Sequence, residues 1–384
     1  VDSARYLQVL TLALNASMSV QDTLKAALAG GKSLKEQDWS LLSDYSWDDP
    51  EQKLVNNKDV ASTLLRLSEI CPPGANATRL YLRALFASAT ASSGQTVPNI
   101  DKAAATQKMM KVLADIKTSR DNLDLVAGAA AELSEFLTPA KSPGRSKLVT
   151  AWNTALLKLA DDTTISKTDR LGALGAMIAL ASLDNAKPGV GLQKDVQKRV
   201  AQIDQATTDA YERQSVVNAA AHALGDAGLL SDSDNLLKAE LKRSHSPYYF
   251  MSTLGSNAKK RGQNADAVNW YEQAYNAAKG PATRLQWGSN YVSNLVDLTP
   301  NDDVRIEKAV GSVFTELAKN ENAFYERNRA YLEKMGGKLV AWNADGKHQQ
   351  AFQKVKMQLE GICAKLPAND DQKATCQTVL SKRS

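Results

Sequence analysis

The sequence predicts an all-α protein, a superhelix of antiparallel helical hairpins. Apolar residues recur at helical spacing along nearly the whole chain, as at Leu171, Leu174 and Ile178. Sustained alternation of apolar and polar residues, the pattern of strands, is absent from the sequence. Breakers that contain Pro or Gly follow one another at short intervals, which is typical of short connections between amphipathic helices.

An N-terminal helical segment is expected over residues 1–140. Its first apolar stripe runs from Tyr6 to Leu14, and a Pro-Pro-Gly breaker at residues 72–74 separates later helices. The stretch 138–147 is rich in Pro, Ser, Gly and basic residues, so we place a domain boundary there. The alternative is a long connection inside one continuous superhelix.

The second predicted domain covers residues 145–384 and consists of tetratricopeptide-like helical hairpins. The clearest match to this pattern of about 34 residues lies between Tyr248 and Pro281. Small residues at Gly255 and Ala267 would let the two helices approach closely, and Tyr271 would fill the groove between repeats. The matching positions are Leu254, Gly255, Ala258, Gly262, Ala267, Tyr271 and Ala274.

Weaker matches flank this hairpin on both sides. One begins near Gln214, one near Leu285 and one near Leu332. Three or more tandem units are what a repeat array needs, because a single hairpin cannot bury its apolar face alone. The alternative is a non-repetitive helical bundle with one chance match.

The three cysteines indicate whether the protein resides in an oxidising compartment. Cys363 and Cys376 flank a Pro-containing, acidic connection, so they are predicted to meet across a helical hairpin and form a disulfide. A disulfide would favour an oxidising compartment, and two buried free thiols are the alternative. Cys71 precedes Pro-Pro-Gly and lacks a resolving cysteine, so we interpret it as a structural residue at a helix end.

Composition excludes several function classes. A net charge of +5 over 384 residues, without a basic stripe, does not predict nucleic-acid binding. No apolar run is long enough for a membrane span, and none of the three histidines has metal-ligand spacing. Phosphate-binding loops and nucleophile motifs are absent from the sequence, so we predict no cofactor, no metal and no catalytic residue.

An enzymatic alternative comes from acidic residues beside aromatic ones. Asp44, Asp48, Asp49 and Glu51 cluster around Trp47 in the sequence, and glycosidases use paired carboxylates. An all-α enzyme acting on polysaccharide is therefore the competing hypothesis. The simpler interpretation is a loop whose acids cap helices and whose aromatic residues anchor it to the core.

The predicted ligand-binding residues lie on the first helix of each hairpin, because repeat arrays of this kind bind peptides or folded partners there. Their amide and cationic side chains suit a peptide backbone or a carboxylate. The candidates are Tyr248, Asn257, Arg284, Asn290, Tyr291, Asn294 and Lys338.

Two passages resemble bacterial thioredoxin-family proteins. Residues 1–10, VDSARYLQVL, resemble the last helix of a thioredoxin-like domain running into a helical extension. Residues 269–275, NWYEQAY, with residues 279–288, KGPATRLQWG, resemble the helical C-terminal region of these exported proteins. The resemblance implies a periplasmic location and a thioredoxin domain preceding Val1. This sequence has no Cys-x-x-Cys, so no redox residue is carried over.

The functional hypothesis is a non-catalytic helical-repeat domain that presents protein or peptide clients for thiol–disulfide exchange by a domain outside this chain. The chain begins with Val1 rather than Met, which we interpret as a sign of processing or truncation. A purely architectural oligomerisation domain is a further alternative, and the sequence does not predict the oligomeric state.

Overall fold

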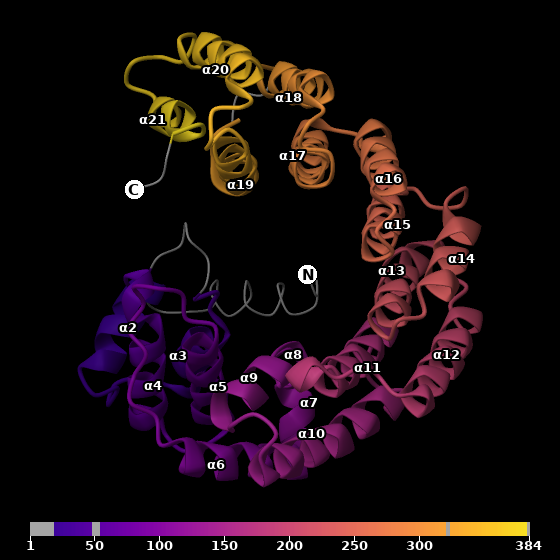
Figure 1. Ribbon diagram of the computed structural model, residues 1–384. Helices are drawn as coiled ribbons and strands as arrows, with labels where there is room; N and C mark the ends of the chain where they lie inside the picture. Colours follow the sequence, from indigo (N-terminus) through magenta and orange to yellow (C-terminus); the bar gives the residue numbers. More distant parts are fainter. Residues whose placement is uncertain (1–18, 48–53, 320–322, 382–384) are drawn as a thin grey trace. The chain divides into compact units, whose positions relative to one another are not determined.

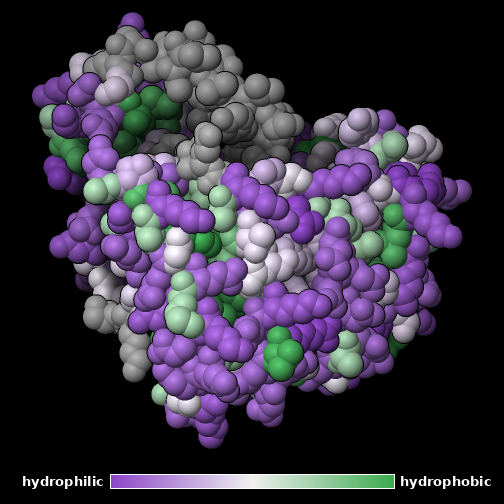
Figure 2. Space-filling model, turned by 90° about the horizontal axis from the view of Figure 1, so that it is seen from above, coloured by the Kyte–Doolittle hydropathy of each residue, from purple (hydrophilic) through white to green (hydrophobic). Residues whose placement is uncertain are grey.

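The computed structural model describes residues 19–47, 54–319 and 323–381 (Figure 1). The predicted all-α class is confirmed: these residues form α-helices and two short 3-10 helices, and none of them forms a strand. Contacts divide the chain into unit 1, residues 1–197, and unit 2, residues 198–384, and each is described by itself. In the view of Figure 2 hydrophilic residues cover most of the surface.

Two apolar cores can be described in unit 1 from its residues 19–47 and 54–197. One surrounds Leu42, Leu64 and Leu80, and the other surrounds Trp152, which is fully buried and donates from Nε1 to the Val126 carbonyl at 2.7 Å. The elements are α2 (Val20–Leu28), α3 (Glu36–Asp44), η1 (Asn57–Asp59), α4 (Val60–Ile70), α5 (Ala75–Ala89), α6 (Lys102–Ala114), α7 (Ile116–Asp121), α8 (Leu123–Gly128), α9 (Ala130–Leu137), α10 (Pro143–Asp161), α11 (Lys167–Ala181), η2 (Leu183–Asn185) and α12 (Val190–Gln205), which crosses into unit 2.

The stretch 138–147, expected to be a domain boundary, lies inside unit 1. Ser142 caps α10 by accepting from the Arg145 amide, and Pro143 occupies the first turn, where a missing N–H costs little. Apolar residues on both sides, Leu137 and Leu148, share one core. The breakers therefore start a helix here, and the division between units falls at residues 197–198 instead.

Unit 2 is built from consecutive helix pairs. Its helices are α13 (Ala210–Asp226), α14 (Leu230–Glu240), α15 (Tyr248–Lys260), α16 (Asn264–Ala277), α17 (Pro281–Leu298), α18 (Asp303–Leu317), α19 (Glu326–Trp342), α20 (Gln349–Cys363) and α21 (Asp371–Thr378). Helix α13 contacts α15, α17 contacts α19, and α18 contacts α20. Helices α17 and α19 therefore lie side by side, as do α18 and α20 (Figure 1). We call the odd-numbered helices α15, α17 and α19 first helices.

The α15–α16 hairpin depends on two glycines. Gly262 has φ +74° in the turn, a conformation that L side chains rarely adopt. A Cβ on Gly255 would lie 2.9 Å from Tyr271 Cε1, so the tyrosine ring packs within this hairpin, against α15. Leu254, Ala267 and Ala274 are buried around this contact.

A disulfide closes the C-terminal end of unit 2. The predicted Cys363–Cys376 bridge is present, and it joins the end of α20 to α21 with a Cα–Cα distance of 5.7 Å. Asp370 caps α21 by accepting from the Gln372 amide. Cys71 is a buried free thiol at the end of α4, and burial raises its pKa to about 11.

Candidate functional site

Polar side chains of three first helices form a connected set, which we call the first-helix face. Its members are Ser252 and Lys259 of α15, Asn290, Asn294 and Asp297 of α17, and Lys338 of α19. Residues three, four or seven positions apart lie on the same side of a helix, which explains why these side chains of α15 and α17 point the same way.

Hydrogen bonds link the face across helices. Asn290 Nδ2 donates to Ser252 Oγ at 3.3 Å, and Lys259 Nζ donates to Asn294 Oδ1 at 3.5 Å. Within α17, Asn294 Nδ2 donates to the Asn290 carbonyl at 2.9 Å and to its side-chain Oδ1 at 3.0 Å. The two amide groups are therefore held side by side on α17, facing α15.

Two lysines from different helices meet one carboxylate on this face. Lys338 Nζ donates to both oxygens of Asp297, at 2.6 and 2.8 Å, and Lys259 Nζ lies 3.9 Å from the same carboxylate. The exposed fractions are 41% for the Lys338 side chain, 43% for Lys259 and 33% for Asp297. Because these groups are in contact with water, their pairing is weak and readily exchanged for a ligand contact.

Aromatic rings lie at the other end of the face. Tyr249 and Trp287 have ring centroids 5.2 Å apart in an edge-to-face arrangement, and Tyr248 lies 5.0 Å from Tyr249 and 5.7 Å from Trp287. Tyr249 is 38% exposed, whereas Trp287 is buried. Tyr249 precedes Ser252 by three residues and Trp287 precedes Asn290 by three, so the rings continue the polar face along α15 and α17.

Three of the predicted binding residues instead hold helices together. Asn257 is 2% exposed and donates to Ser233 Oγ and Asp234. Tyr291 is buried and its hydroxyl accepts from Arg305 Nε at 3.0 Å.

Arg284 is the third of these residues. It donates to the backbone carbonyls of Tyr275 and Ala278, and its guanidinium lies over the Tyr275 ring at 4.7 Å. Helical spacing identifies the side of a helix but does not tell which neighbouring groups occupy that side.

The structure brings together Asn290, Asn294 and Lys338 among the predicted residues, with Tyr248 at the aromatic end. Sequence reasoning missed Ser252, Lys259 and Asp297. A signal was present, because Ser252 lies four residues after the predicted Tyr248, Lys259 lies seven after Ser252, and Asp297 lies seven after the predicted Asn290.

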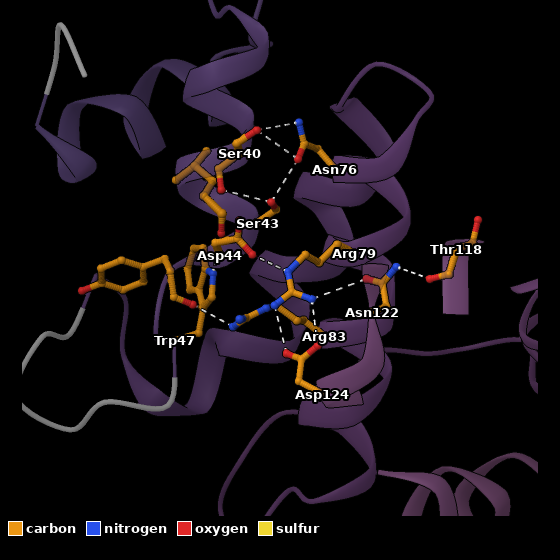
Figure 3. A network of polar contacts seen from close by, with 12 residues as sticks. Ser40, Ser43, Asp44, Trp47, Asn76, Arg79, Arg83, Thr118, Asn122 and Asp124 are labelled. Carbon is orange, nitrogen blue, oxygen red and sulfur yellow. Dashed lines mark hydrogen bonds and ion pairs between the residues drawn. The ribbon is translucent and has the colours of Figure 1, made fainter. Parts of the chain in front are cut away.

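Of the acidic residues in the enzymatic alternative, the structure describes Asp44. Asp44 accepts from Arg79 Nε at 2.6 Å, and Arg79 also pairs with Asp124 at 2.9 Å (Figure 3). The other acids of that cluster, Asp48, Asp49 and Glu51, lie outside the described residues. The described acid therefore takes part in an ion-pair network that joins α3, α5 and α8.

In the part of the chain that the structure describes, no group of three or more His, Cys, Asp or Glu side chains is placed to hold a metal ion. Among residues 19–47, 54–319 and 323–381, no helix combines the length and apolar content needed to span a lipid bilayer. His222 contacts Thr253 Oγ1 at 3.5 Å, and burial lowers the pKa of its imidazole.

Comparison with known proteins gives no relative from which to transfer a function. No protein-family model matches the chain, and no curated protein matches it significantly.

Proposed function

We propose that this chain is a non-catalytic, tetratricopeptide-like helical-repeat domain that binds protein or peptide clients on the first-helix face of unit 2. The observation that carries the proposal is the connected set of polar side chains from three successive first helices. Its amides and lysines join residues 35 to 41 positions apart in the sequence, across packed helices. Repeat arrays bind extended partners along such surfaces.

The chemistry of the face suits an extended polypeptide. An amide side chain both donates and accepts, so the pair Asn290 and Asn294 matches the alternating N–H and C=O groups of a peptide backbone. Lys259 and Lys338 surround one carboxylate, leaving one excess positive charge for an acidic side chain or terminal carboxylate of the client. Tyr248 and Tyr249 offer apolar area beside these groups.

The proposed setting is the periplasm of a bacterium, within a thioredoxin-family protein. The Cys363–Cys376 disulfide supports an oxidising compartment. In this setting the face would hold a client near the dithiol of a separate thioredoxin domain. Tethering raises the effective concentration of the client's cysteines without any new catalytic group in this chain.

A binding measurement with matched variants tests the proposal. The probe is reduced, carboxymethylated α-lactalbumin, an unfolded acidic chain, and its affinity is measured by fluorescence anisotropy. We expect the double variant Asn290→Ala/Asn294→Ala to bind about tenfold more weakly, since two hydrogen-bonding groups are lost. Lys338→Met should weaken binding about threefold, with less effect at high salt.

The matched control is Lys308→Met. This lysine is exposed and lies on α18, which is not one of the first helices. Its affinity should remain within about twofold of that of the parent chain. Absence of binding by the parent chain, or equal affinity of the double variant and the control, would overturn the proposal. Circular dichroism of each variant establishes that the helices are retained.

A further inference from the structure

The side chains of α15 and α17 meet at three levels on the first-helix face. The pairs are Tyr249 with Trp287, Ser252 with Asn290, and Lys259 with Asp297. The ring centroids of the first pair are 5.2 Å apart, the second pair shares a hydrogen bond of 3.3 Å, and the charged atoms of the third pair lie 3.9 Å apart. Each pair is separated by 38 positions in the sequence. Because this separation is constant, α15 and α17 run in the same direction, with these side chains in register.

We call the three levels the aromatic, amide and charged layers. Trp287, Asn290 and Asp297 lie on one side of α17, because the second and third follow the first by three and ten positions. At a helical rise of about 1.5 Å per residue, the amide layer lies about 4.5 Å and the charged layer about 15 Å from the aromatic layer. Asn294 lies between them, about 10.5 Å from the aromatic layer. The face therefore changes along the helix axes from aromatic through amide to charged.

The aromatic layer offers a packing surface for a further ring. Tyr249 is 38% exposed, and its ring packs edge-to-face against the buried Trp287. Tyr248 adds a third ring, whose centroid lies 5.0 Å from that of Tyr249. Aromatic side chains attract one another beyond the area that they bury. An aromatic side chain of a client therefore finds a partly exposed platform at this layer.

The charged layer favours a carboxylate. Lys338 donates to both oxygens of Asp297, and Lys259 lies beside the same carboxylate. The next cations of α15, Lys260 and Arg261, pair instead with acidic residues of α13 and α14, at 2.8 Å each. A client carboxylate at this layer is therefore attracted by two ammonium groups and repelled by one acid. The three side chains of the layer are at least 33% exposed, so exchanging partners costs little.

An extended chain matches these layers at one spacing of its residues. Such a chain rises about 3.4 Å per residue, and its side chains alternate between two opposite sides. Residues four positions apart are on the same side and about 14 Å apart, close to the separation of about 15 Å between the aromatic and charged layers. Residues two or six positions apart are on the same side but only about 7 Å or as much as about 20 Å apart. Residues three or five positions apart point to opposite sides.

We infer that the first-helix face recognises an extended client segment in which an aromatic and an acidic residue are four positions apart. The segment lies along α15 and α17, with its backbone beside Asn290 and Asn294. This inference rests on the client binding proposed above and specifies the sequence that is bound. A client that lay across the first helices would meet one layer only, so its affinity would not depend on this spacing.

Isothermal titration calorimetry of the full chain with short peptides tests the inference. The peptides have identical composition, one Trp and one Asp in a background of Ser and Asn, and they differ only in the spacing of the two residues. Spacings of two, three, four and six positions are measured, with the Trp first and with the Asp first, because an extended chain can run in either direction. In the tighter-binding order we expect the four-position peptide to bind about fivefold more tightly than the others.

A variant assigns the preference to the charged layer. Lys259→Met should weaken binding of the four-position peptide about threefold and leave a peptide with Asn in place of Asp unchanged. The control Lys308→Met, at an exposed position of α18, should retain the full preference. Equal affinities at all four spacings would overturn the inference while leaving client binding intact. Failure of every peptide to bind, when α-lactalbumin does bind, would also overturn it, and failure of both probes would overturn the proposed function as well.

Discussion

Replacement of Arg79 by methionine is expected to lower the free energy of opening of the α3–α5–α8 region by about 3–5 kcal/mol. Arg79 is 6% exposed and pairs with both Asp44 and Asp124, so its removal breaks two ion pairs and the link between α3 and α8 that runs through α5. Breaking ion pairs that a buried guanidinium makes is costly, whereas methionine preserves much of the side-chain volume.

Native-state hydrogen exchange with increasing denaturant measures this effect region by region, which suits a chain with two units. The control is Arg66→Met on α4, an exposed arginine that donates to the Leu28 carbonyl. Its cost should be below about 1 kcal/mol. Similar opening free energies for the Arg79 and Arg66 variants would contradict the role assigned to the ion-pair network.

Removal of the disulfide in the double variant Cys363→Ala/Cys376→Ala is expected to lower the stability of the α20–α21 segment by about 3 kcal/mol. The bridge closes a short loop, with a sequence separation of 13, and joins α21 to α20. Without it, the unfolded segment has more conformational freedom, so α21 should open more readily. Hydrogen exchange of residues 371–378 measures the change.

A reducing agent provides the internal control for this prediction. It should destabilise α21 in the parent chain and have no effect in the double variant. Alkylation of the denatured, non-reduced parent should modify one thiol, that of Cys71, because the other two cysteines are bridged. Three modified thiols, or unchanged exchange in the variant, would contradict the expected contribution of the bridge.

The sequence predicted helices and turns well where residues close together in the sequence determine them. The apolar stripe of Leu171, Leu174 and Ile178 lies in α11, and Gly262 occupies the turn between α15 and α16. The pairing of Cys363 with Cys376 also followed from a short, turn-containing separation. Such features depend on contacts between residues close in sequence, which periodicity and turn chemistry describe.

Contacts between distant segments were not predictable in the same way. Nothing near Arg79 in the sequence indicates that Asp44 and Asp124 approach it, because the three residues lie on separate helices. The same reason explains why Asn257 was expected at a binding surface and is buried against Asp234. Residues 138–147 have a linker-like composition, yet α10 begins within this stretch, at Pro143, with Ser142 as its cap.

Site-specific photocrosslinking tests client binding at the first-helix face most directly. A benzophenone amino acid replaces Lys259 on α15 in one variant and Lys308 on α18 in the other, both exposed positions. After irradiation with reduced, carboxymethylated α-lactalbumin, we predict covalent adducts from position 259, suppressed by excess unlabelled probe, and few from position 308. Equal adduct yields at the two positions, or none at position 259, would contradict client binding on the first helices.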